Sequence, residues 1–140
     1  MILLDTNIIS EVMKPLPDGR VIDWMNTTTS NSLFVSTITI AEIHYGLQLL
    51  PDSRRRIDLE NSFQQFLSRG FDQRVVPFDV PAARLYGTLM AHRRRTGTLL
   101  ASLDGQIASI ARVHGFTVAT RNGDRFADCG VELVNPFAAP

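Results

Sequence analysis

The chain has 140 residues, of which 44% are hydrophobic and 20% charged, a composition typical of one globular domain that can bury its own core. Its 14 Lys and Arg residues balance 14 Asp and Glu residues, so bulk charge does not indicate a nucleic-acid partner. The single cysteine, Cys129, excludes a disulfide framework. Because the sequence has neither a signal-peptide pattern nor an apolar run of membrane-spanning length, we expect one cytoplasmic domain over residues 1–140.

Short apolar runs predict the strands of a buried sheet. The first run is continuous rather than alternating, which is typical of a strand that is covered on both faces. The third run contains Pro77, which favours an edge position because proline cannot donate to a strand ladder. The predicted strands cover residues 1–4, 33–36, 75–78, 116–120 and, as a possible fifth, 131–134.

Apolar residues at helical spacing lie between these runs and predict helices. The expected helices cover about residues 8–13, 39–50 and 57–67, a segment that begins at Pro81, and residues 102–114. Within the third of them, Ile57 is a candidate core residue. Strands that alternate with helices predict an α/β domain with a mainly parallel sheet and right-handed crossovers. Such sheets bind ligands outside the carboxyl ends of their strands, so candidate site residues are sought there.

Acidic and amide side chains follow three of the predicted strands. Asp5 comes directly after the first strand, and Glu42 lies in the first turn of the helix after the second. Asn122 and Asp124 follow the fourth strand. Because the carboxyl ends of parallel strands share one edge, these four residues are expected to converge. The rule does not place Asp104, which begins the helix before the fourth strand, so its location stays open.

Each of these residues also has a purely structural explanation. Asp5 can cap the following helix, and Thr39 with Glu42 forms an S/T-x-x-E capping box. Asp104 suits a helix N-terminus, and the stretch RNGD at 121–124 is good turn chemistry. Several neighbouring carboxylates, however, repel one another unless they share a cation. An all-oxygen cluster favours Mg²⁺ or Mn²⁺, and such an ion supports phosphodiester hydrolysis.

The order of the motifs is more specific than any one of them. LLDTNIISE opens the chain, STITIAEIHYG follows about thirty residues later, and LDGQIASIARVHG and TVATRN come near the end. Together they resemble the PIN-domain ribonucleases, and more narrowly the VapC and FitB-like toxins of bacterial toxin–antitoxin pairs. The resemblance covers nearly the whole chain. It implies a three-layer PIN-like domain with a four- to five-stranded sheet flanked by helices.

The resemblance also implies roles for individual residues. Asp5 and Asp104 match direct metal ligands, so Asp104 joins the site. Glu42 matches the third acid, which helps to bind the metal or activates the attacking water, and Thr6 matches a hydroxyl that orients the first aspartate. If Asp5 binds a cation, Thr6 or Asn7 can cap the first helix in its place.

The fourth acidic position departs from the family pattern. Relatives often carry Asp where this chain has Asn122, or a DF pair further on, whereas NGDRF places Arg125 before Phe126. Asn122 can bind water or coordinate weakly, and Asp124 can supply the missing charge. Both therefore stay candidate site residues, and a second metal ion is not implied.

The function implied is that of a Mg²⁺- or Mn²⁺-dependent endoribonuclease toxin. The resemblance further implies a homodimer and a small, DNA-binding, VapB-like antitoxin that neutralises the nuclease. Two arginine runs, Arg54–Arg56 and Arg93–Arg95, are candidate RNA contacts, and the second is preferred. The alternative is a weakly active or inactive PIN-fold module that binds RNA or the antitoxin, because its fourth acid is altered.

Overall fold

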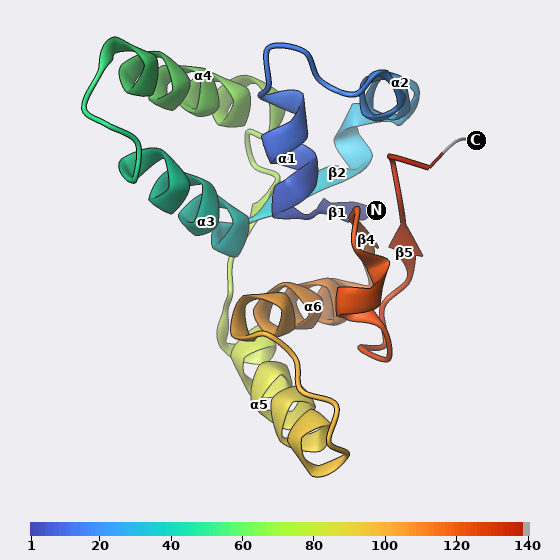
Figure 1. Cartoon of the computed structure of the whole chain (residues 1–140). Coiled ribbons are helices and arrows are strands. Elements are labelled where there is room, and N and C mark those ends of the chain that lie inside the picture. Colours follow the sequence, from blue (N-terminus) through green and yellow to red (C-terminus); the bar gives the residue numbers. More distant parts are fainter. Residues whose placement is uncertain (139–140) are drawn as a thin grey trace.

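The computed structural model describes residues 1–138 and shows a five-stranded sheet with helices on both faces (Figure 1). All neighbouring strands are parallel, and their order across the sheet is β3-β2-β1-β4-β5. The strands are β1 (Ile2–Leu4), β2 (Leu33–Ser36), β3 (Val75–Val76), β4 (Thr117–Ala119) and β5 (Leu133–Val134). The predicted α/β architecture with a parallel sheet is confirmed. Of the single domain expected over residues 1–140, residues 139–140 lie outside the described part.

Six α-helices and two short 3₁₀ helices connect the strands. The α-helices are α1 (Thr6–Val12), α2 (Gly19–Thr27), α3 (Thr37–Gln48), α4 (Arg54–Gly70), α5 (Val80–Arg95) and α6 (Ser102–His114). The 3₁₀ helices are η1 (Ser30–Ser32) and η2 (Gly123–Phe126). Helices α5 and α6 pack on one face of the sheet, and α1, α2, α3 and α4 pack mainly on the other. No helix within residues 1–138 has both the length and the apolar character needed to cross a membrane.

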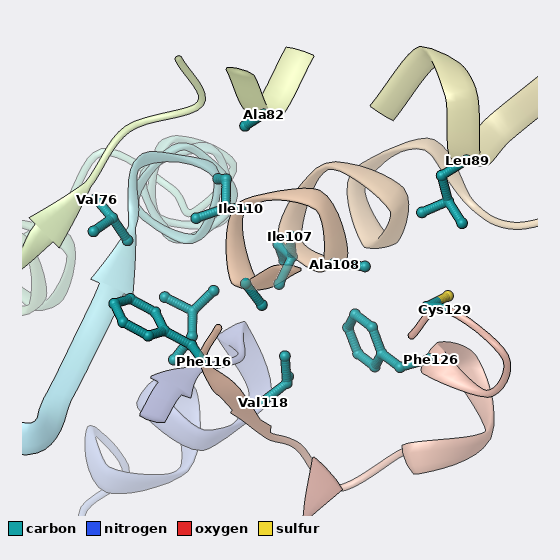
Figure 2. Packing of buried hydrophobic residues seen from close by; sticks show 12 residues of the cluster. Val76, Ala82, Leu89, Ile107, Ala108, Ile110, Phe116, Val118, Phe126 and Cys129 are labelled. Carbon is teal, nitrogen blue, oxygen red and sulfur yellow. The ribbon is translucent and has the colours of Figure 1, made fainter. Parts of the chain in front are cut away.

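The central strand explains why the opening run is apolar without alternation. Leu3 packs into the core under α5 and α6, whereas its neighbour Leu4 packs into the opposite core under α1. Both side chains are fully buried, and burial of each contributes roughly 1.5–3 kcal/mol. Figure 2 shows the first core, in which Ile107 and Ile110 of α6 meet Val118 of β4. The two cores hold β1 in the middle of the sheet, so the residue after Leu4 lies at the centre of its carboxyl edge.

The edges of the sheet are short strands. Val75 and Val76 pair only with β2 among the described strands, and Pro77 follows directly. The predicted edge position of this strand is confirmed. At the other edge, Leu133 and Val134 pair with β4, so the possible fifth strand is also present.

One helix was not predicted, and two local expectations are wrong. Helix α2 was not predicted, although Asp18 caps it and Val21, Trp24 and Met25 place apolar side chains against the second core. Helix α4 begins at Arg54, and Ile57 is 48% exposed rather than part of the core, because the helix turns Phe63 inward. The start of α3 also differs and bears on the site.

Candidate active site

Three carboxylates meet at the carboxyl edge of the central strand. Asp5 directly follows β1, Glu42 lies in α3 behind β2, and Asp104 lies in the first turn of α6. Asp5 is fully buried, Asp104 is 6% exposed and Glu42 is half-buried. Helix α6 leads into the parallel strand β4, so it starts at this edge of the sheet, which explains how Asp104 reaches the other two acids.

Asp5 is held rigidly by backbone and side-chain donors. Its own N–H donates to the carbonyl of Ala119 at the end of β4 (2.9 Å). The N–H of Thr6 donates to Asp5 Oδ1 (2.8 Å), and the hydroxyl of Thr120 donates to Asp5 Oδ2 (2.9 Å). Asp5 also occupies the N-cap position of α1, so the structural role and a place in the acidic cluster coexist in one residue. The expectation that Thr6 or Asn7 would cap this helix is wrong.

Glu42 is oriented by the residue after Asp5. The hydroxyl of Thr6 donates to Glu42 Oε1 (2.8 Å) and lies 3.2 Å from the hydroxyl of Thr39. Helix α3 begins at Thr37, and the hydroxyl of Ser36 accepts from the N–H of Thr39 (3.1 Å). The predicted capping box of Thr39 and Glu42 is therefore wrong, because Ser36 is the cap. Glu42 lies beyond the first turn, and its carboxylate faces the cluster instead of a helix N–H.

Asp104 is paired with an arginine that also faces Asp5. Both oxygens of Asp104 accept from the guanidinium of Arg125, with Nε to Oδ2 at 3.1 Å and a second bond from Nη2 to Oδ1. Arg125 Nη1 lies 3.9 Å from Asp5 Oδ2. The guanidinium also acts electrostatically on Glu42. One cation thus faces all three carboxylates.

The remaining two predicted site residues lie at the rim. The backbone N–H of Asn122 donates to the hydroxyl of Thr120 (3.2 Å), which places Asn122 one hydrogen bond from the partner of Asp5. Its side chain is exposed. Asp124 is also exposed, and its carboxylate makes no hydrogen bond or ion pair within residues 1–138. The structure thus brings Asp5, Glu42 and Asp104 together and does not bring Asp124 to them.

The electrostatics of the cluster show incomplete neutralisation. Burial raises the pKa of Asp5, and the Asp104 charge raises it further, although the bonds from Thr120 and Thr6 and the charge of Arg125 oppose this. Burial also raises the pKa of Glu42, with smaller upward contributions from Asp5 and Asp104. One guanidinium therefore does not offset the desolvation and mutual repulsion of three buried or half-buried acids, and a stronger cation would be stabilised here.

The donor set fits a hard divalent cation, although not in the present arrangement. Within the described residues, no three acidic, His or Cys side chains converge closely enough to hold a metal ion as they stand. Arg125 lies among the acids, and Asp5 and Asp104 already share its charge. Oxygen-only donors of this kind suit Mg²⁺ or Mn²⁺ rather than zinc. Asp5 and Asp104 are the residues that could hold such an ion, with Glu42 beside them.

A polar hollow of about 330 Å³ opens beside the acids. Thr6 and Glu42 line it together with three cations, Lys14, Arg121 and Arg125. Glu11 also lines the hollow and pairs with Lys14 (3.0 Å). Cationic side chains next to the acidic cluster could hold the negatively charged phosphodiester of a nucleic acid.

The arginine run at the end of α5 is divided between two environments. Arg93 is buried, and its guanidinium donates to the carbonyls of Thr98 (2.7 Å) and Ala127 (2.8 Å). Only Arg94 and Arg95 of this run are exposed. The proposed RNA contact by the whole run is therefore wrong for Arg93, which ties α5 to the segment after η2.

Three residues that organise the site have roles that the sequence did not indicate: Thr120 and Arg125 had been given no role in the site, and Asn7 only that of a possible helix cap. Thr120 binds Asp5, Asn7 accepts from the N–H of Arg121 (3.3 Å), and Arg125 pairs with Asp104. A signal for Thr120 was present, because it opens the TRN motif at the end of the predicted fourth strand. The missing information was that β4 lies next to β1, which only the strand order supplies.

Comparison with known proteins decides the family. The sequence model of the PIN domain matches residues 2–131. The chain belongs to the PIN domain family. It is 39% identical to VapC ribonuclease Y4jK of Sinorhizobium fredii over 98% of both chains. It is 36% identical to toxin FitB of Neisseria gonorrhoeae over 98% of this chain and 99% of that protein.

The same PIN domain fold is found in solved structures. A structure of FitAB bound to a DNA fragment matches with a TM-score of 0.92 and 36% identity, covering 100% of this chain and 98% of the other. The resemblance to VapC and FitB-like PIN domains, together with the expected three-layer fold, is confirmed.

Proposed function

We propose that this PIN domain is the ribonuclease toxin of a toxin–antitoxin pair and that it hydrolyses RNA phosphodiester bonds with Mg²⁺ or Mn²⁺. The observation that carries the proposal is the meeting of Asp5, Glu42 and Asp104 around one cationic position. The likeness to a VapC ribonuclease and to toxin FitB over nearly the full length of the chain supports the same activity.

Each residue of the cluster has its own role in the proposed reaction. Asp5 and Asp104 would hold the metal ion, which supplies Lewis-acid polarisation of the phosphoryl group and a more acidic bound water. Glu42, oriented by the hydroxyl of Thr6, accepts the proton of the attacking water, and its raised pKa brings its basicity closer to neutral pH. Lys14 and Arg121 line the hollow and bind backbone phosphates of the RNA. Asn122, whose N–H binds the hydroxyl of Thr120, contributes from the rim, whereas no role is proposed for Asp124.

Cleavage of a labelled single-stranded RNA by the purified chain tests the proposal. Wild type is compared with Asp5→Asn, with wild type in EDTA, and with Asp72→Asn as the matched control. Asp72 is exposed, and its side chain makes no hydrogen bond or ion pair within residues 1–138. We expect cleavage by wild type and Asp72→Asn with Mg²⁺ or Mn²⁺, and its loss in the other two samples. Equal cleavage in all samples would refute a metal-dependent nuclease.

The second candidate, a binding module with little activity, is favoured by one observation. Arg125 lies among the acids where a nuclease needs a metal ion. Retention of the same RNA on a filter without cleavage, at saturating Mn²⁺, would support this module over the nuclease.

An antitoxin partner and a homodimer complete the proposal. The FitAB relative is bound to DNA in its solved structure, which supports a DNA-binding partner for this chain as well. We expect a neighbouring short reading frame to encode a small VapB-like protein with a DNA-binding N-terminus. Its product should co-purify with the chain and suppress cleavage, and light scattering of the free chain should give the mass of a dimer. The pair would act in the cytoplasm.

A further inference from the structure

We propose that Arg125 is a built-in competitor of the metal ion: its guanidinium neutralises Asp104 and Asp5 in the metal-free chain and must leave before a cation binds. This inference rests on the metal-dependent site proposed above. It concerns a residue that shares the site with the acids and has the opposite charge.

The contacts of Arg125 place it where the metal ion is needed. Two of its nitrogens donate to the two oxygens of Asp104, and a third lies 3.9 Å from Asp5 Oδ2. Asp5 and Asp104 are the pair of acids that would hold the metal ion. Both of these acids face the same guanidinium in the present arrangement. Within residues 1–138, no three acidic, His or Cys side chains lie so that they could hold a metal ion in that arrangement.

The surroundings of Arg125 allow its guanidinium to move away from the acids. Its side chain is 40% exposed, whereas the carboxylate of Asp104 is 8% exposed, so the guanidinium has access to solvent that its partners lack. The next residue, Phe126, is 1% exposed and anchors η2 in the core, and the guanidinium lies over its ring, 5.7 Å from the ring centroid. All side-chain hydrogen bonds of Arg125 within residues 1–138 go to Asp104. Its departure therefore breaks the ion pairs with Asp104 and Asp5 and the cation–π contact with Phe126, all of which lie at the site, and breaks no hydrogen bond to the backbone of the described residues.

Arg125 competes with a metal ion for the acids because its guanidinium cannot become neutral by losing a proton. The guanidinium stays charged at any pH at which the chain is folded, and the pairing with Asp104 raises its pKa further. A divalent cation beside Asp5 and Asp104 would face this fixed positive charge unless the side chain swings into the hollow that it lines. The pairing thus protects the metal-free acids from mutual repulsion and weakens the binding of the metal ion.

Calorimetric titration of Mn²⁺ into the EDTA-stripped chain tests the inference. The variants are Arg125→Ala, Arg125→Gln, Asp5→Asn and the control Arg84→Ala. Arg84 lies exposed on α5, and its side chain makes no hydrogen bond or ion pair within the described residues, so its removal changes the net charge equally. Arg125→Gln keeps a polar side chain and provides a second measurement should Arg125→Ala fail to fold.

We expect Arg125→Ala and Arg125→Gln to bind Mn²⁺ at least about tenfold more tightly than wild type, since a charge-assisted competitor is lost. Arg84→Ala should stay within about twofold, because a distant surface charge is screened. Without metal, Arg125→Ala should melt below wild type, and saturating Mn²⁺ should remove the difference. Unchanged or weaker binding by both Arg125 variants, with Asp5→Asn losing binding, would overturn the competitor alone. Binding by Asp5→Asn equal to that of wild type would overturn the metal site itself.

Discussion

Removal of the Thr120 hydroxyl deletes the side-chain donor to Asp5, together with the acceptor for the N–H of Asn122 (3.2 Å) and for Asn7 Nδ2 (3.5 Å). The substitution Thr120→Val keeps the shape of the side chain but deletes the donor to Asp5 Oδ2, which lies at 2.9 Å. Asp5 is fully buried, so no water replaces the lost donor, and the remaining cation, Arg125, lies 3.9 Å from the same oxygen. A buried carboxylate that loses one hydrogen bond destabilises a fold by about 1.5–3 kcal/mol. For a chain of 140 residues this lowers the melting temperature by about 5–10 °C.

Urea unfolding in EDTA measures this loss directly, with Thr117→Val as the matched control. Thr117 begins β4, the strand that ends directly before Thr120, and is half-buried, but its hydroxyl makes no hydrogen bond within residues 1–138. We expect an unchanged m-value for both variants and a lower midpoint for Thr120→Val alone. Since protonation of Asp5 removes the need for the donor, the loss should shrink in acid. Equal free energies of unfolding for the two variants would refute the positioning role of Thr120.

Two further predictions concern the arginine run and the charge of the cluster. Arg93→Ala should lower the free energy of unfolding by about 2 kcal/mol, because two carbonyls lose their donor. The control Arg84→Ala, on the same helix, should change it by less than about 0.5 kcal/mol. Urea titrations measure both values. Asp5 and Glu42 have raised pKa values, so the folded state holds protons that the unfolded state releases. The contribution of these two protonated carboxyls to the free energy of unfolding is therefore complete below about pH 4 and is lost as pH rises through the raised pKa values. In EDTA the melting temperature should therefore fall, as pH rises above the ordinary carboxyl range, more steeply for wild type than for Asp5→Asn, and parallel curves would contradict this.

The sheet and its flanking helices were predictable because their signals are local. Continuous apolar runs identified the buried strands, and alternation with helices required parallel pairing. The strand order was not predictable from residues alone, because no local pattern says that β4 lies beside β1. The family resemblance added Asp104 to the site but did not give the strand order, which comes from the structure.

The details of the site depended on competition between neighbouring polar residues. Ser36, Thr37 and Thr39 can each begin α3, and the hydroxyl of Ser36 does so because it reaches the N–H of Thr39 (3.1 Å). Because Ser36 caps α3, Glu42 does not cap the helix and instead belongs to the acidic cluster. The sequence also carried Arg125 as a departure from the family pattern, but only the structure shows that it pairs with Asp104.

The central proposal for the site is that Asp5 and Asp104 hold the same metal ion. A double-mutant cycle of Mn²⁺ binding tests it most directly, with Asp5→Asn, Asp104→Asn and the double variant, each checked for a cooperative melting transition. If both residues hold one ion, each single substitution should remove nearly all binding and the double variant should lose little more. Binding by Asp104→Asn equal to that of wild type, or two small losses that simply add, would contradict the shared site.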